Sequence, residues 1–474
     1  MIEIGIFDTG ALDMPFKKTA NGIRVMDGNL GDIHRHTQEM MKAAVRRCVL
    51  ADQLDYDIYW LVEHHFNIEG AEISPSPLQV QAAAAALTKK IRLGQLANIL
   101  TWWHPLRLAE QLAVLDVLSG GRVEAGISRG YQPRETETFG FAYGSTTQDQ
   151  EKNRSFFDEA FTLLKKAWTE DSFSHHGEFF SVPPSWAKWN HSQTIAALSE
   201  PGFGPTLDDV LDVGPPDLYS GGMPVVATTT RLKELSVLPH PVQKPYPPLW
   251  EGVTSDRSLR WAARNAVNGN FFYESAAMIR SKIEIYMEEA EKNNWPDRVN
   301  PGVPFKAGWD GERRRGLIAS RVIHVQEGSV GNLKKAGECE MFLWDFYAPF
   351  GFSGILGDPG KPFDPNIPVT PELLRDRDVI FQGSKQQVLE SILKLYNDAY
   401  LGEDMCLNLR FESGGMGHEE VEEQMWFFAE EILPELRKEC GGGPNHPDVT
   451  TTQELKPLIA DRIAAREKEA AASA

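Results

Sequence analysis

Residues 59–66 read YWLVEHHF, so that four apolar or aromatic residues run directly into an acid and two histidines. This pattern is typical of a buried strand that ends in ionisable groups. In barrels of parallel strands, the catalytic groups follow the strands at their carboxyl ends. The stretch therefore predicts a strand with a candidate site at Glu63, His64 and His65. By itself, a histidine after a strand is more often a surface or hydrogen-bonded residue than a catalyst.

Seven further apolar runs alternate with helical patterns along the chain. Eight strands separated by helices predict a (β/α)8 barrel, which is an α/β fold. The predicted strands cover residues 2–7, 58–62, 91–100, 122–127, 248–252, 269–272, 318–325 and 405–411. The predicted helices cover residues 37–54, 77–87, 105–118, 149–168, 255–264, 276–293, 386–399 and 419–437.

Two segments interrupt this alternation, residues 181–246 and 347–375, and both are rich in Pro, Gly and polar residues. Loops of this length inside a compact domain commonly form lids or binding segments, and neither composition predicts a core of its own. We expect one barrel domain over residues 1–440 that carries both segments as insertions. Residues 441–474 are expected to form a C-terminal extension with a short exposed helix or a frayed end.

The composition describes an ordinary globular protein of 474 residues, with 42% hydrophobic and 24% charged residues. Its net charge of -19 disfavours nucleic acid and anionic membranes as partners. The four cysteines are too few and too scattered for a disulfide scaffold or a Cys-x-x-Cys zinc motif, so we expect reduced thiols. No export signal and no apolar run long enough for a membrane span are evident, and we expect a cytoplasmic protein.

Polar groups suited to an anionic cofactor follow two of the predicted strands. Ser128 and Arg129 place a hydroxyl and a fixed cation at one strand end, and Arg154 near the start of the next helix adds a second cation. Residues 252–255, Gly-Val-Thr-Ser, lead into a helix whose amino end could bind a phosphate. A Thr-Ser pair at a helix start is more often only a cap.

The sequence from residue 55 to residue 140 resembles the bacterial luciferase-like flavin-dependent monooxygenases. The shared motifs, in family order, are Glu-His-His-Phe at 63–66, Thr-Lys-Lys at 88–90 with Gly94 after it, His-Pro at 104–105, Leu-Asp at 115–116, Ser-Gly-Gly-Arg at 119–122 and Gly-Ile-x-Arg-Gly at 126–130. The resemblance extends over roughly residues 1–180, 240–290 and 380–440, whereas the two insertions have no counterpart.

The resemblance implies that the anion is reduced FMN and assigns roles to specific residues. His64 matches the catalytic base of the family, with Glu63 and His65 beside it. The residues that match the family's cofactor site are Leu96, Ala97, Asn98, Ser128 and Arg129 for the flavin ring, and Arg154, Gly252, Thr254 and Ser255 for the phosphate. The spacing of the loop at 252–255 differs from that of the family, and luciferase has a reactive cysteine where this chain has Ser128.

The implied function is oxygenation of a small organic substrate with reduced FMN and dioxygen. A separate flavin reductase would supply the reduced flavin, and family members commonly form dimers, so a homodimer or higher homo-oligomer is expected. No metal is expected.

Three other functions stay open on the sequence. A deazaflavin-dependent oxidoreductase of the same superfamily would use a related cofactor. A metal-dependent barrel hydrolase is suggested by the His-x-His spacing of His34 and His36, although no histidine follows the fifth or sixth predicted strand. A non-catalytic flavin-binding protein could share the fold, because a fold alone does not imply activity.

Overall fold

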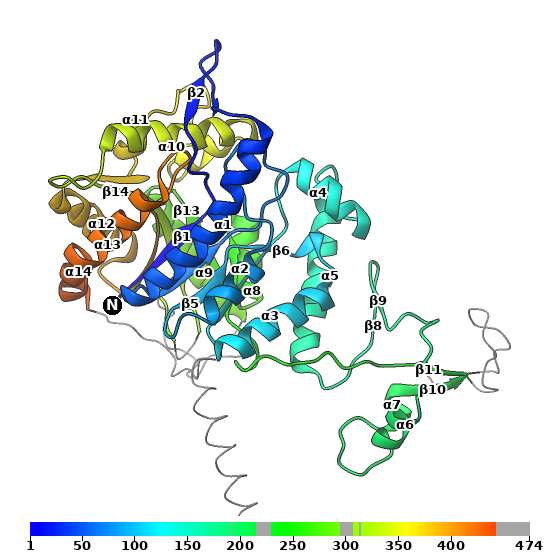
Figure 1. Ribbon diagram of the computed structural model, residues 1–474. Helices are drawn as coiled ribbons and strands as arrows, with labels where there is room; N and C mark the ends of the chain where they lie inside the picture. The colour runs from blue at the N-terminus through cyan, green and yellow to red at the C-terminus, as the bar shows by residue number, and fades with distance from the viewer. Residues whose placement is uncertain (190, 215–228, 294–306, 312–313, 442–474) are drawn as a thin grey trace, which may run out of the picture. The chain divides into compact units, whose positions relative to one another are not determined.

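The protein is described from a computed structural model that covers residues 1–189, 191–214, 229–293, 307–311 and 314–441 (Figure 1). Residues 442–474, nearly all of the predicted C-terminal extension, lie outside the described residues. Among the helices in the described ranges, none combines the length and the apolar character needed to cross a membrane.

Eight parallel strands close into a barrel with helices around it (Figure 1). Each strand pairs with the next, and the last returns to the first. In order around the barrel they are β1 (Ile2–Asp8), β4 (Ile58–Leu61), β5 (Arg92–Gln95), β7 (Val123–Ser128), β12 (Leu249–Gly252), β13 (Asn268–Phe272), β14 (Leu317–Val325) and β16 (Met405–Arg410). The predicted fold class is confirmed, and all eight predicted strands are present.

Several strands lie outside the closed ring. The predicted strand at residues 91–100 is two strands, because β5 ends at Gln95, the Leu96–Ala97 peptide bond is cis and a short β6 (Asn98–Ile99) follows. β15 (Ile380–Gly383) pairs with β14 off the ring. The remaining strands form antiparallel pairs, β2 (Phe16–Lys18) with β3 (Arg24–Met26), β8 (His175–His176) with β9 (Ser181–Val182), and β10 (Leu211–Gly214) with β11 (Thr229–Leu232).

The eight predicted helices are all present, two of them with different bounds or a division, and five further helices in the described residues were not predicted, namely α4, α6, α7, α10 and α11. α1 begins at Leu30 rather than at residue 37, where Asn29 forms a capping box with Asp32. The predicted helix at 419–437 is two helices that meet before Pro434, and α10 (Leu333–Tyr347) was not predicted. The helices are α1 (Leu30–Gln53), α2 (Pro77–Ala85), α3 (Pro105–Ser119), α4 (Pro133–Phe139), α5 (Gln150–Thr169), α6 (Ser192–Leu198), α7 (Leu207–Val210), α8 (Asp256–Arg264), α9 (Ala276–Asn293), α10, α11 (Pro371–Asp376), α12 (Lys385–Tyr400), α13 (His418–Glu431) and α14 (Leu433–Cys440), with short 3-10 turns at Leu100–Trp102, Gly140–Tyr143, Ala348–Phe350 and Phe352–Leu356.

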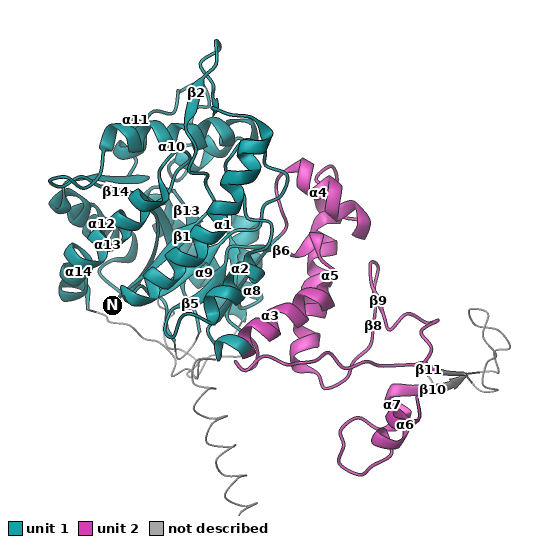
Figure 2. Ribbon diagram, viewed as in Figure 1, with its two compact units in different colours: residues 1–98, 118–128, 247–474 teal, residues 99–117, 129–246 magenta. Residues whose placement is uncertain are grey.

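The chain divides into two compact units (Figure 2). The barrel unit holds residues 1–98, 118–128 and the described residues from 247 onward, and the second unit holds residues 99–117 and 129–246. Within the second unit, Leu198, Val210 and Leu211 form a small buried apolar cluster. The insertion at 181–246 therefore does bury a cluster of its own, contrary to the expectation from its composition. The single domain with two insertions stays a prediction.

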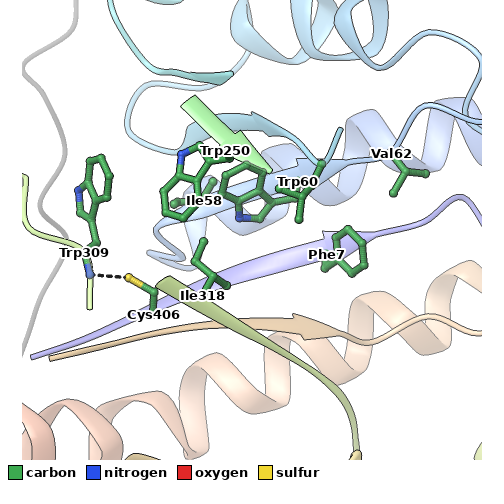
Figure 3. Packing of buried hydrophobic residues seen from close by; sticks show 9 residues of the cluster. Phe7, Ile58, Trp60, Val62, Trp250, Trp309, Ile318 and Cys406 are labelled. Carbon is green, nitrogen blue, oxygen red and sulfur yellow. Dashed lines mark hydrogen bonds between the residues drawn. The ribbon is translucent and has the colours of Figure 1, made fainter. Parts of the chain in front are cut away.

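Aromatic side chains fill the inside of the barrel (Figure 3). The rings of Trp60 and Trp250 meet edge to face with centroids 5.4 Å apart, and Trp309 lies 5.6 Å from Trp250. A Cβ added at Gly94 would lie 2.1 Å from the Trp60 ring, so only glycine leaves room for this tryptophan. The barrel is thus a packed core rather than a channel, and any chemistry belongs to its ends.

Candidate active site

Most of the predicted site residues lie at one end of the barrel. All eight strands are parallel, so their carboxyl ends meet at the same rim. Residues 63–65 follow β4, residues 96–98 follow β5, Ser128 ends β7, and residues 252–255 join the end of β12 to α8. Arg129 and Arg154 belong to the second unit and are described with it.

His64 is buried directly after β4 and has a carboxylate beside its ring. Its backbone N–H donates to the carbonyl of Ser74 at 3.1 Å, which fixes the loop after β4 against the strand end. Its Nε2 lies 3.4 Å from Oε2 of Glu72, and both side chains are buried. The other carboxylate oxygen of Glu72 accepts a hydrogen bond of 2.5 Å from the Tyr347 hydroxyl. Sequence reasoning missed both Glu72 and Tyr347.

The neighbouring pair of predicted catalytic residues has a different arrangement. Oε1 of Glu63 lies 3.4 Å from Nε2 of His65, and Glu63 is buried whereas His65 is partly exposed. The two adjacent histidines therefore face different carboxylates. On this part of the rim, the Glu72 carboxylate lies within reach of the His64 ring nitrogen.

A buried polar network holds the end of β1 to α1. The Asp8 carboxylate accepts hydrogen bonds from Nε and Nη2 of Arg47, at 2.9 Å and 2.6 Å, and from the Tyr59 hydroxyl. Burial raises the pKa of Tyr59 well above its usual value, and the nearby Asp8 charge adds to this effect, so Tyr59 is a neutral donor. At the next residue, the Thr9 hydroxyl donates to Glu412 at 2.7 Å, and burial raises the pKa of Glu412. These hydrogen bonds tie the end of β1 to α1, β4 and the segment after β16.

Asn98 presents a buried acceptor at the end of β5. Its Nδ2 donates to Oε1 of Gln95 at 3.1 Å and to the carbonyl of Gly126 at 3.0 Å, whereas its Oδ1 has no hydrogen-bond partner in the described structure. Buried acceptors are almost always paired, so this oxygen suits a donor on a ligand. Leu96 and Ala97 are buried next to it and present apolar surface.

The predicted phosphate loop at 252–255 is partly used for helix capping. The Ser255 hydroxyl accepts from the backbone N–H of Ser258 at 3.2 Å, and the acidic Asp256 lies in the first turn of α8. Thr254 is exposed beside this helix start. A Cβ at Gly252 would lie 2.7 Å from the Phe272 ring, so the close approach of these two strands requires glycine. Ser255 therefore caps the amino end of α8, as one interpretation of the Thr-Ser pair predicts.

The second unit brings its two predicted arginines to the same helix. Nη1 of Arg129 donates to Oδ1 of Asn153 at 3.0 Å and to Oε1 of Gln150 at 3.3 Å, and both partners are on α5. Arg154 follows on α5 and forms an ion pair with Glu151 at 3.7 Å. Two guanidinium groups therefore lie at the amino end of α5, where a helix favours an anion.

No cluster of three or more His, Cys, Asp or Glu side chains that could hold a metal ion occurs in the part of the chain that the structure describes. His34 is exposed and His36 partly exposed on α1.

A cavity of about 390 Å³ lies beside the loop that carries Glu72. It is bounded by the β2–β3 hairpin, the start of α1, Ile68 and Glu69 of that loop, and Phe342 and Phe346 of α10. The ion pair of Arg24 with Asp345, at 2.8 Å, lies at its wall. The cavity is mainly apolar and is large enough for a small organic group.

A family model described as luciferase-like monooxygenase matches residues 23–223. Over this part, which is less than half of the chain, the sequence is similar to that family. The match includes His64 and the strands β4, β5 and β7, whose ends form the rim described above.

One family relative is the oxygenase component of a flavin-dependent trigonelline monooxygenase from Acinetobacter baylyi, 24% identical over 231 residues. The aligned part is 49% of this chain and 48% of the relative, so the chain spans about half the length of that protein.

Two solved structures share the fold. The oxygenating constituent of 3,6-diketocamphane monooxygenase from Pseudomonas putida, in complex with FMN, has a TM-score of 0.60 at 19% identity and covers 91% of this chain and 98% of its own. An F420-dependent secondary alcohol dehydrogenase has a TM-score of 0.54 at 13% identity and covers 91% of this chain and 98% of its own. The fold therefore occurs with both flavin and deazaflavin enzymes.

Proposed function

We propose that this protein is the oxygenase component of an FMN-dependent monooxygenase that inserts one oxygen atom from dioxygen into a small organic substrate. The observation that carries the proposal is the buried His64, which follows β4 at the carboxyl rim of the barrel with the Glu72 carboxylate 3.4 Å from its ring. A histidine beside a carboxylate is suited to moving a proton near neutral pH. The match of residues 23–223 to the luciferase-like monooxygenase model supports the choice of oxygenation.

The residues at the rim fit a flavin. The unpaired Oδ1 of Asn98 would accept a ring N–H of the isoalloxazine, and Leu96, Ala97 and Ser128 would line the ring. On the barrel unit, Thr254 would contribute a hydroxyl to the phosphate. The phosphate-binding role of Arg129 and Arg154 on the second unit stays a prediction from the sequence. Gly252 and Ser255 would shape the turn before α8. Reduced FMN supplies the electrons that activate dioxygen when it is bound.

In this proposal, the chain contributes proton transfer and exclusion of water. His64 takes up or returns a proton at the reacting group, and Glu63 with His65 forms the adjoining wall of the site. The rigid network around Asp8 holds this rim in shape. General acid–base catalysis of this kind contributes roughly 10²–10⁴-fold to a rate.

A separate flavin reductase is part of the proposal, because an oxygenase component takes its reduced flavin from elsewhere. The trigonelline relative, which is named as an oxygenase component, supports this arrangement. A homodimer or higher homo-oligomer and a cytoplasmic location stay predictions.

The proposal is tested by following ¹⁸O₂ into products. The purified protein is supplied with FMN, NADH and a flavin reductase, and a panel of aldehydes, ketones and aromatic compounds is screened by mass spectrometry. We expect a labelled product from the wild type. We expect His64→Ala to bind reduced FMN and to lose the labelled product, while His34→Ala, which changes an exposed histidine on α1, retains it.

If His64→Ala forms as much labelled product as the wild type, His64 has no part in the mechanism. If a substrate is oxidised or reduced only when F420 is supplied, and without dioxygen, the protein is a deazaflavin-dependent oxidoreductase and not a monooxygenase. Flavin binding without turnover of any compound, together with no acceleration of flavin oxidation, would favour a non-catalytic flavin-binding protein.

A further inference from the structure

We propose that Glu72 is the positioning residue of His64 and that Tyr347 fixes Glu72 in place. The inference rests on the proposed function only for the catalytic role of His64. The geometry of the three side chains is independent of that role.

The three groups form a chain across the rim of the barrel unit. Nε2 of His64 lies 3.4 Å from Oε2 of Glu72, and Oε1 of Glu72 accepts from the Tyr347 hydroxyl at 2.5 Å. The exposed fractions of the His64 and Glu72 side chains are 9% and 6%, so water screens their interaction poorly. A distance of 3.4 Å is longer than an ideal hydrogen bond, and catalytic contacts commonly shorten only when the ligand is present.

The loop that carries Glu72 is pinned on both sides of this residue. The carbonyl of Glu72 accepts from Nδ2 of Asn67 at 3.0 Å, and the N–H of Ile73 donates to the carbonyl of Gly10 at 3.0 Å. The carbonyl of Ser74 then accepts from His64 itself. The Glu72 carboxylate therefore cannot move far without breaking the contacts that define the end of β4.

Glu72 also has an unfavourable backbone conformation. Its φ is +52°, in the left-handed region, which is strained for a residue with a side chain. Burial of its carboxylate adds a desolvation cost. Such features persist when the surrounding structure enforces them, and they concentrate at functional sites. Here both occur in one residue that contacts His64.

The chemistry of the arrangement gives it a defined effect. A carboxylate at Nε2 accepts the proton on that nitrogen, so Nδ1 becomes the nitrogen that gains and releases the catalytic proton. The negative charge also favours the protonated ring and makes His64 a stronger base. At this end of β4, Glu63 and His65 also face each other, and Tyr347 faces Glu72.

Tyr347 gives the segment after β14 a part in the site. It is the last residue of α10 and is 275 residues from Glu72 in the chain. The same helix lines the apolar cavity beside the loop. Residue 347, where the sequence predicts only the start of the second insertion, thus supplies the hydroxyl that orients the Glu72 carboxylate.

The test is a ¹⁵N NMR titration of the histidines in the protein labelled with [¹⁵N]histidine, with the His64 signals assigned from their absence in His64→Gln. In the wild type we expect the neutral ring to carry its proton on Nε2. In Glu72→Gln we expect the midpoint of the His64 titration to fall by about one pH unit or more, the shift typical of losing an opposite charge at this distance.

The matched control is Glu69→Gln, which removes the same charge from an exposed position of the same loop and should leave the midpoint in place. A neutral His64 protonated on Nδ1, or a midpoint that moves equally in both variants, would overturn the proposal. The tautomer is measured on the wild type, so this part of the test does not depend on the folding of Glu72→Gln.

A kinetic measurement then separates this inference from the proposed function. With a compound that is oxygenated, Glu72→Gln should lower kcat by roughly 10-fold to 100-fold with little change in KM, less than the loss of the base itself. Oxygenation that persists in His64→Ala would contradict the proposed role of His64, whereas the NMR result would still decide whether Glu72 positions its ring. An unchanged kcat in Glu72→Gln, with His64→Ala inactive, would contradict the positioning role alone.

Discussion

At the scale of single residues, the surroundings of a side chain decide its chemistry more than its place in a motif. His64 and His65 are adjacent, yet one ring is buried against Glu72 and the other is partly exposed against Glu63. A carboxylate in a buried pair acts through a lower dielectric than one at the surface. The buried histidine is therefore the better candidate for proton transfer.

Arg154 offers a second test at this scale. Its guanidinium is partly exposed at the amino end of α5 and pairs with Glu151 at a distance of 3.7 Å, which is long for a strong ion pair. We expect Arg154→Ala to weaken the binding of reduced FMN by about 1.5–3 kcal/mol, as for one hydrogen bond to a charged group. Anaerobic titration measures this, with Arg107→Ala on α3 as an exposed control that should bind normally. Unchanged binding in Arg154→Ala would exclude this arginine from the phosphate site.

The candidate site was predictable from the sequence only where its signal is local. The run from Tyr59 to His65 shows the strand and its polar end within seven residues, and Ser128 with Arg129 stands at the end of its strand in the same way. Glu72 and Tyr347 have no such signal, since one lies in a loop and the other is 275 residues away. Glu72 and Tyr347 come into contact only when the barrel closes, so the spacing of residues along the sequence could not predict this contact.

At the scale of elements, strands were easier to predict than the helix that completes the rim. Buried parallel strands are short continuous apolar runs between turns, and all eight stand out in this way. α10 is buried on most of its surface, including Gly337, Glu340 and Trp344, so it shows no alternation between an apolar and a polar face. Its sequence therefore resembles neither a surface helix nor a strand.

The contact between α10 and the loop after β4 should contribute to stability. The Tyr347 hydroxyl donates to the buried Glu72 carboxylate, and removing a donor from a buried charged acceptor typically costs about 1–3 kcal/mol. We expect Tyr347→Phe to lower the free energy of unfolding by about this amount, measured by urea unfolding. Phe346→Tyr, at a partly buried neighbour on the same helix, is a size-matched comparison that keeps the hydrogen bond. No loss of stability in Tyr347→Phe would mean that Glu72 is satisfied by other groups.

At the scale of the whole molecule, the barrel separates a rim for chemistry from a charged cluster at the opposite end. Near the amino ends of the strands, Nη2 of Arg92 donates to Glu3 at 2.9 Å, and its Nε lies 3.4 Å from Glu124. Burial raises the pKa of Glu3 to about 8, despite the nearby Arg92. One cation thus lies against two buried acidic side chains, and the raised pKa favours the protonated form of Glu3 at neutral pH.

This cluster should make stability depend on pH. Because the pKa of Glu3 in the folded protein is raised from 4.5 to about 8, its contribution to stability is fully present below pH 4.5 and is lost as the pH rises toward 8. We expect Glu3→Gln to lose stability less steeply than the wild type between pH 5 and pH 8 in urea unfolding. The exposed Glu69→Gln should follow the wild-type slope. Parallel slopes for Glu3→Gln and the wild type would show that Glu3 is ionised in the folded protein.

The proposed function requires that the rim of this barrel bind reduced FMN for a reaction with dioxygen. The most direct measurement is an anaerobic titration of the purified protein with reduced FMN, with reduced F420 as the comparison, followed by admission of dioxygen. We predict saturable binding of reduced FMN, close to one molecule for each chain, and weaker binding of F420. Preferential binding of F420, or no saturable binding of reduced FMN, would contradict the account.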